Sequence, residues 1–237
     1  MKKIVSLFLI FTSLLAGAQS EMKTAQGFLF TPTVAFHTPM GDLADRFEGF
    51  TSIGLQIEYK TKSNWILGAD YEWFFGDAVK TDGLFRGITG PSGVVIDNNG
   101  DFGIINPSLR GNYITANGGR LFNLSKRRPN SGILFTVGLG FMQHRIDFNS
   151  SEVTLPQVNG EYEKGYDKLT YGFATKQFLG YQYLEDKRKV HLRAGVEFNQ
   201  GFTQGRRTWD FAANTSGLDS RFDGTFAFKI GLIVPVY

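Results

Sequence analysis

The sequence predicts an all-β chain, folded as an eight-stranded antiparallel up-and-down β-barrel. Apolar and polar residues alternate along most of the chain after residue 19. Such alternation is typical of strands, because successive side chains point to opposite faces of a sheet. The alternating segments number eight, and short and long connections join them in turn. An even number of strands joined in this way is typical of a closed up-and-down barrel.

The first three strands show the alternation most clearly. They are predicted at 27–37, 50–60 and 64–75, and in the third every odd-numbered residue from Trp65 to Phe75 is apolar. In 190–199 the even-numbered residues are apolar, whereas the odd-numbered ones are His, Arg, Gly, Glu and Asn. In chain order, the remaining five strands are predicted at 104–115, 132–146, 169–184, 190–202 and 222–236.

The connections and the strand ends indicate a transmembrane barrel. The alternative is a soluble lipocalin-like barrel or sandwich, which would turn the same apolar faces inward instead of toward lipid. Aromatic residues near the strand ends and the terminal Tyr237 favour the membrane barrel. The short connections are predicted at 61–63, 116–131 and 185–189, and the long ones at 38–49, 76–103, 147–168 and 203–221.

The N-terminus predicts a cleaved secretory signal peptide at residues 1–18. A basic pair, Lys2 and Lys3, precedes an apolar run that ends at Leu15, and small residues follow. The run is shorter than the roughly 20 apolar residues of a membrane-spanning helix. Cleavage leaves one barrel domain at 19–237 and lowers the formal net charge from +3 to +1, because it removes two lysines and no acid.

Composition narrows the classes of function. The chain has no cysteine, which excludes thiol catalysis, and its mature charge near zero gives no reason to expect a nucleic-acid partner. Since no P-loop, dinucleotide or zinc-protease motif occurs, we expect no catalytic set, no metal and no cofactor. Two minor alternatives remain: a lipid-A-modifying enzyme using His37 or His144 with Ser150 or Ser151, and a calcium loop at 97–101.

Charged residues on the non-lipid faces predict a closed lumen. An eight-stranded barrel has an interior just wide enough for its own side chains, and charges buried there must be paired. We therefore expect a salt-bridge network of five acids and five bases instead of an open pore. Its members are Glu58, Lys60, Asp70, Glu72, Arg110, Lys176, Arg193, Glu197, Asp223 and Lys229.

Two connections carry candidate partner-docking residues. The link 116–131 is long for the periplasmic side and basic, and loop 203–221 combines arginines with aromatic residues, which are enriched at protein interfaces. A solvated turn and loops folded over the barrel mouth are the alternatives. The candidates are Arg120, Lys126, Arg127, Arg128, Arg206, Arg207 and Trp209.

Four stretches of the chain resemble a known group of proteins. They are 38–47 (TPMGDLADRF), 129–132 (PNSG), 138–144 (GLGFMQH) and 177–183 (QFLGYQY). The chain resembles the small outer-membrane β-barrel proteins of the Bacteroidota, a group that includes accessory barrels of type IX secretion and of outer-membrane assembly machinery. The resemblance implies an outer-membrane location, the lipid bilayer as surroundings, and outer-membrane or periplasmic proteins as partners.

Together these observations predict a non-enzymatic accessory or scaffold subunit of an envelope protein machine. A small-solute channel or receptor is the main alternative, and the lipid-A-modifying enzyme is a remote one.

Overall fold

The computed structural model describes most of the chain after residue 25. The described residues are 26–80, 83–85, 87–90, 94–97, 99–125, 128–149, 155, 158–185 and 190–236. The predicted signal peptide at 1–18 and Tyr237 lie outside this set, as do the docking candidates Lys126 and Arg127 and the serines Ser150 and Ser151.

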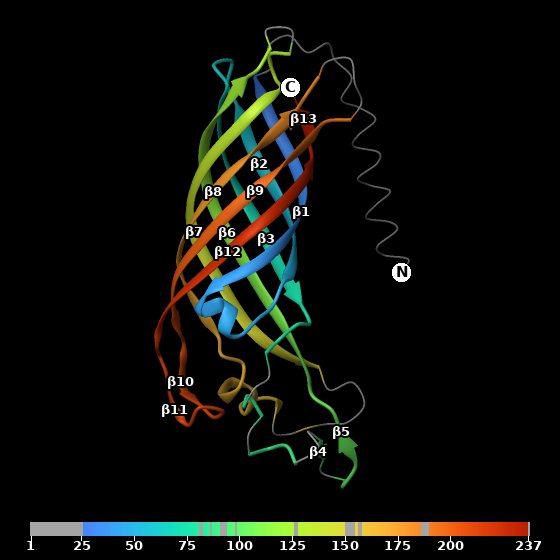
Figure 1. Ribbon diagram of the computed structural model, residues 1–237, viewed down its shortest axis with the longest axis vertical. Helices are drawn as coiled ribbons and strands as arrows, with labels where there is room; N and C mark the ends of the chain where they lie inside the picture. Colours follow the sequence, from blue (N-terminus) through green and yellow to red (C-terminus); the bar gives the residue numbers. More distant parts are fainter. Residues whose placement is uncertain are drawn as a thin grey trace.

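Eight long strands form one closed antiparallel sheet in the described part of the chain (Figure 1). Each strand pairs with the next, and the last pairs back onto the first, from Thr33 opposite Gly231 to Gly41 opposite Asp223. The predicted fold class is confirmed. The strands are β1 (Gly27–Gly41), β2 (Phe50–Lys60), β3 (Trp65–Gly76), β6 (Asn106–Asn123), β7 (Gly132–Asn149), β8 (Thr170–Tyr183), β9 (Leu192–Gly205) and β12 (Ser220–Leu232).

The last predicted strand is interrupted near its end. A short strand, β13 (Val234–Val236), follows β12 after Ile233 and pairs with β1. The backbone N–H of Ile233 donates to the carbonyl oxygen of His191 at 2.9 Å, and its side chain is buried against Leu29 and Leu184. The break therefore turns one apolar side chain inward at this end of the barrel.

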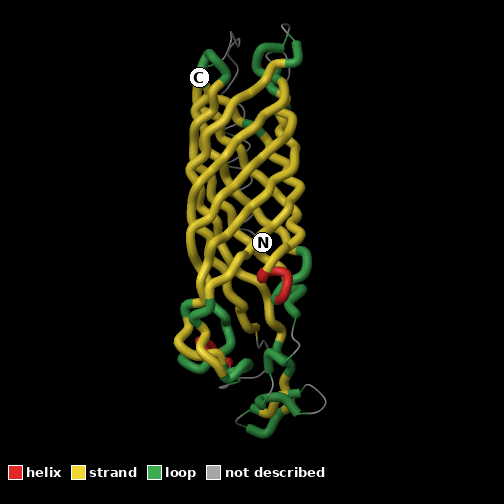
Figure 2. Tube along the Cα trace, turned by 60° about the vertical axis from the view of Figure 1, so that its left-hand side comes forward, coloured by secondary structure: helices red, strands yellow, loops and turns green. Residues whose placement is uncertain are grey.

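The two ends of the barrel differ in their connections (Figure 2). At one end, which we call the periplasmic end, the strands are joined by shorter connections, at 61–64, 124–131 and 184–191, and at the other, which we call the extracellular end, by the longer ones. Long loops on the extracellular side are typical of such barrels. The long connections contain the 3-10 turns η1 (Asp42–Asp45) and η3 (Glu163–Gly165), and two hairpins made by β4 (Val95–Ile96) with β5 (Phe102–Gly103) and by β10 (Arg207–Asp210) with β11 (Thr215–Gly217).

The prediction of a basic link at 116–131 is wrong for 116–123, because β6 continues to Asn123. The sequence Asn117-Gly118-Gly119 has the composition of a turn but lies within the ladder between β3 and β7. A Cβ atom on Gly119 would lie 2.1 Å from the carbonyl oxygen of Phe135. Close approach of the neighbouring backbone therefore explains this glycine.

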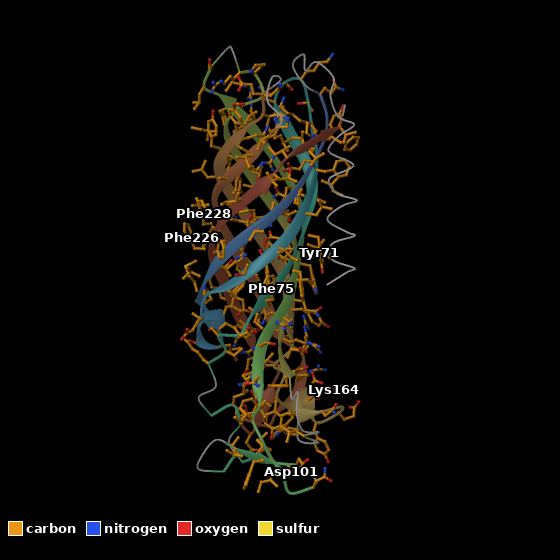
Figure 3. All side chains as sticks on the ribbon, turned by 90° about the vertical axis from the view of Figure 1, so that its right-hand side faces the viewer. Tyr71, Phe75, Asp101, Lys164, Phe226 and Phe228 are labelled. Carbon is orange, nitrogen blue, oxygen red and sulfur yellow. The ribbon has the colours of Figure 1, made fainter. Side chains whose placement is uncertain are left out.

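Apolar side chains cover the outside of the barrel. Leu139 on β7 is 61% exposed, and Tyr71, Phe75, Phe226 and Phe228 stand on the outer surface (Figure 3). Charged side chains fill the inside, which is the reverse of a soluble barrel and the arrangement of a barrel surrounded by lipid. No helix among the described residues is long and apolar enough to span a membrane.

The polarity of the two faces reverses toward the extracellular end. On β7 the outward positions change from Leu139 and Phe141 to Gln143 and Arg145, while the inward Met142 and Ile146 are apolar and buried. The outer surface is therefore apolar along only part of the strand, and the barrel continues beyond this apolar band.

We predict that Gly119→Ala destabilises the barrel by about 1–3 kcal/mol, because its methyl group would overlap backbone of β7. The matched control is Gly118→Ala, whose methyl group would meet only the movable end of the Leu67 side chain, at 3.2 Å. Urea titration of the detergent-folded protein, followed by tryptophan fluorescence, measures both. Equal stability of the two variants would contradict this account of Gly119.

Candidate functional site

Five charged side chains meet in the middle of the barrel. This central ion cluster consists of Asp70 and Glu72 on β3, Lys176 on β8, Glu197 on β9 and Lys229 on β12, all buried. The Nζ atom of Lys176 lies 2.7 Å from Asp70, 2.5 Å from Glu72 and 3.6 Å from Glu197. Lys229 Nζ lies 2.5 Å from Glu72 and also pairs with Glu197. Each ammonium thus bridges carboxylates from more than one strand.

Neutral hydrogen bonds complete the central ion cluster, which has one more carboxylate than ammonium groups. The hydroxyl of Ser52 donates to Glu72 at 2.9 Å, and His37 Nε2 lies 2.8 Å from the same hydroxyl oxygen. The amide of Asn199 donates to Glu197 at 3.0 Å. These donors help to offset the extra negative charge, because an ion buried without partners loses its hydration.

Two further buried ion pairs lie on either side of the cluster along the strands. Toward the periplasmic end, Arg193 pairs with Glu58 at 2.7 Å and donates to the side-chain oxygens of Gln56 and Gln182. Lys60 is fully buried two residues along β2 from Glu58.

Toward the extracellular end, His144 Nε2 lies 2.9 Å from Asp223. The guanidinium of Arg221 lies 3.3 Å from the same carboxylate. Charged side chains therefore occupy the lumen at three successive levels.

Arg110 does not belong to the lumen, contrary to the prediction. It lies on the outward face of β6 with Asn112, and its Nη1 donates only to the carbonyl oxygen of Leu109 among the described residues. Its neighbours Leu109 and Tyr113 point inward and are buried. The prediction failed because the polarity of the faces reverses at this level. The other nine predicted residues are buried inside the barrel.

Apolar side chains close the lumen at both ends. At the extracellular end, Leu43 and Phe47 of the first long connection pack inside the barrel against Phe50 and Phe74, in the largest apolar cluster of the described residues. At the periplasmic end, a smaller cluster joins side chains from β3, β6, β7 and β8. Its members are Ile66, Leu121, Leu134 and Phe178. The lumen is thus packed with side chains along its length.

The central cluster has the carboxylates of a metal site but a different cation. Ligand atoms of Asp70, Glu72 and Glu197 lie within 4.8 Å of one another, close enough to share a metal ion. The ammonium groups of Lys176 and Lys229 already lie among them at hydrogen-bond distance. In this arrangement the two lysines supply the positive charge that a metal would otherwise bring.

The histidines of the enzyme alternative lie in the interior. His37 contacts the hydroxyls of Ser52 and Thr225 and stacks on Phe50, and its side chain is buried, as is that of His144. A general acid or base must reach its substrate, so these buried rings serve as partners of neighbouring polar groups.

In the calcium candidate at 97–101, the described residues Asp97, Asn99 and Asp101 make local hydrogen bonds. The Asp97 carboxylate accepts the backbone N–H groups of Asn99 and Asp101, at 2.7 and 2.8 Å. One carboxylate oxygen is therefore already used to stabilise the local backbone, as in an ordinary Asx turn.

The docking candidates lie at opposite ends of the barrel. Arg120 is part of β6, where its guanidinium carbon lies 5.7 Å from the ring centre of Trp65, and Arg128 lies 3.5 Å from Glu185. At the other end, Arg206 stacks over Tyr171 at 4.1 Å, Trp209 is exposed, and Arg207 is held by Asp167. The hydrogen bonds that Arg207 donates to the Asp167 carboxylate raise the pKa of Arg207 above its usual range. The structure thus brings Arg206, Arg207 and Trp209 to one end and does not join them to Arg120.

Arg46, which follows η1 at the extracellular mouth, is not among the site residues predicted from the sequence. Its Nη1 donates to the carbonyl oxygen of Lys168 and to the hydroxyl of Thr170. The residue lies in a predicted loop with no periodic pattern, and the resemblance of 38–47 assigns it no role.

Comparisons with known proteins identify fold neighbours only. No family model matches the chain, and no curated protein matches it. The solved structures similar to it include Ail, the attachment invasion locus protein of Yersinia pestis, at 11% identity and a TM-score of 0.46, covering 89% of this chain and all of that one. Neisserial surface protein A is similar at 13% identity and a TM-score of 0.44, covering 87% of this chain and 96% of that one. The N-terminal β-barrel domain of Pseudomonas aeruginosa OprF has 12% identity and a TM-score of 0.35, covering 86% and 97%.

We predict that Lys176→Met destabilises the folded barrel by about 3–5 kcal/mol, because it leaves three buried carboxylates with one ammonium group. Adding Glu197→Gln to Lys176→Met should cost less than the sum of the two single changes, since it removes one of the stranded charges. Urea titration measures all three variants, with Lys62→Met in an exposed turn as control. Additive losses would show that the charges do not act together.

Proposed function

We propose that the chain is a non-enzymatic outer-membrane β-barrel, closed to solutes, which acts as an accessory or scaffold subunit of an envelope protein machine in secretion or outer-membrane protein assembly. Its apolar outer surface and charged interior support a position in a lipid bilayer. The resemblance of the sequence to small outer-membrane barrels of the Bacteroidota supports the class of machine. Because side chains fill the lumen, a partner would bind to the outer surface or the loops of the protein.

The observation that carries the accessory role is an apolar patch on the β4–β5 hairpin. Phe102 is 77% exposed and Ile104 is 67% exposed, and Ile96 on the paired strand is exposed as well. The hairpin lies far beyond the extracellular end of the barrel (Figure 1), so lipid does not cover these side chains. Contiguous apolar side chains in water mark sites of protein interaction. We refer to these three residues as the hairpin patch.

The β10–β11 hairpin offers a second exposed surface at the same end. Trp209 and Phe211 are exposed there, beside Arg207, which donates to Asp167 in the connection before β8. Trp and Arg side chains are the types that contribute most to binding at protein interfaces. A partner on the extracellular side would be able to contact both hairpins.

The hairpin patch is tested by affinity purification of a tagged copy from native outer membranes in mild detergent. We expect envelope proteins to co-purify in fixed ratio, and Phe102→Ser with Ile104→Ser to lower that ratio at least about tenfold, since central apolar contacts can each contribute about 2 kcal/mol or more. The control is Leu124→Ser, which is 66% exposed at the periplasmic end.

Two results would contradict the accessory role. One is a clean monomer from wild-type membranes after chemical cross-linking. The other is an unchanged ratio of partner to barrel in the doubly substituted protein, with folding checked by the shift in electrophoretic mobility on heating.

The closed lumen makes a separate prediction that distinguishes the proposal from a small-solute channel. We expect purified protein in planar bilayers to give no steady conductance above the lipid background, because charged and apolar side chains pack the interior from end to end. Single-channel recording measures this. Reproducible steps from the wild-type protein would show that ions pass through the barrel.

A further inference from the structure

Two neighbouring cavities open at the extracellular mouth and share Arg46 and Lys168 in their walls. The larger has a volume of about 270 Å³ and lies between the first long connection, the start of the connection after β3, and β7. Its wall includes Asp45, Arg46, Lys80, Lys168, Leu84 and Ile146. The smaller has a volume of about 30 Å³ and reaches Arg221 of β12. We call the larger one the mouth cavity.

The walls of the two cavities are rich in basic side chains. Together they present six lysine and arginine side chains and three aspartates. Three carboxylates outside the walls, those of Glu161, Asp167 and Asp223, pair with Lys164, Arg207 and Arg221. The attraction of the site for an anion therefore depends on the cations that have no such partner.

Most of the cations in these walls are already paired with carboxylates. Lys168 lies 3.1 Å from Asp210, and Arg221 lies 3.3 Å from Asp223. Nevertheless the Nε atom of Arg221 is buried without a hydrogen-bond acceptor among the described residues. One donor at the edge of the site is therefore still unsatisfied.

Arg46 and Lys80 differ from these cations. Arg46 Nη1 donates to the carbonyl oxygen of Lys168 at 3.1 Å and to the hydroxyl of Thr170 at 2.9 Å, and Lys80 Nζ donates to the carbonyl oxygen of Ala44 at 2.8 Å. In the described part of the chain, no carboxylate oxygen lies within 4 Å of either charged group. Among the described residues, the charged groups of Arg46 and Lys80 are thus hydrogen-bonded but form no direct ion pair.

The surroundings of Arg46 disfavour its positive charge. Burial lowers its pKa to about 10, and the nearby charge of Arg221 lowers it further, against the opposing effect of Asp223, Asp210 and Asp42. The group is still protonated at neutral pH, so an anion bound beside it would relieve this unfavourable charge.

We propose that the mouth cavity binds a phosphate monoester carried on a small organic group. The guanidinium of Arg46 and the ammonium of Lys80 would contact the phosphate oxygens, because a guanidinium presents paired donors to such groups and a lysine supplies a compact charge. Leu84 and Ile146 would contact the organic part. A phosphate monoester carries close to two negative charges at neutral pH, which matches these two cations, neither of which forms an ion pair with a described residue.

The same chemistry has two sources at this surface, a soluble organophosphate and the phosphate of a lipid headgroup. The experiment therefore uses glycerol 3-phosphate and micellar lysophosphatidate as probes, with glycerol as the uncharged control. Isothermal titration calorimetry of the folded full chain in a zwitterionic detergent measures each affinity. The probe that binds more tightly identifies the source.

We expect Arg46→Gln and Lys80→Gln each to weaken binding of the preferred probe about tenfold, the effect of losing one charged hydrogen bond. Lys62→Gln, in an exposed turn at the periplasmic end, should leave the affinity unchanged. Because Arg46 is partly buried, Lys80→Gln on the exposed side keeps the test informative should Arg46→Gln fold poorly. Failure of both phosphate probes to bind the wild type, or equal binding by Lys80→Gln, would overturn the proposal. This site is independent of a protein partner at the hairpin patch.

Discussion

The pairing of charges inside the barrel is the constraint on which the rest of the structure depends. Eight strands leave room for side chains but for little water, so each buried ion needs an opposite charge or a hydrogen bond. Lys176 on β8 and Lys229 on β12 meet this need, because both pair with Glu72 on β3 and with Glu197 on β9. The shared carboxylates thus link four strands. The strand register is fixed as a consequence, because a slip of one residue would turn these charges outward to lipid.

The reversal of polarity along the strands explains how one barrel serves two surroundings. β7 has 18 residues and therefore a length of about 60 Å, or roughly 40–50 Å along the barrel axis at the usual tilt, whereas the apolar band of such barrels is about 25 Å tall. The remainder projects into water, where Arg145 faces outward and Ile146 packs inside. The extracellular part of the barrel thus has the polarity of a soluble barrel, with an apolar interior and a polar exterior. A cavity with apolar and basic walls can therefore form there.

The sequence was sufficient for the fold because alternation depends only on which face meets lipid, and this rule holds over most of each strand. Prediction from this rule failed at residues whose position depends on other contacts. Gly119 looked like a turn because nothing in one chain reveals the approach of a neighbouring backbone, and Arg110 was placed on the wrong face because the rule reverses above the lipid. The inward fold of Leu43 and Phe47 and the position of Arg46 depend on loop packing, which has no periodic signature.

The composition of the central ion cluster has a consequence for the order in which the barrel assembles. Glu72 is on the third strand, whereas its partner Lys229 is 157 residues later, on the last long strand. A sheet that lacks β12 would hold three carboxylates with Lys176 alone. Burying that unbalanced set is unfavourable, so the pairing of β12 with β1, which brings Lys229, favours closure of the ring as a cooperative step.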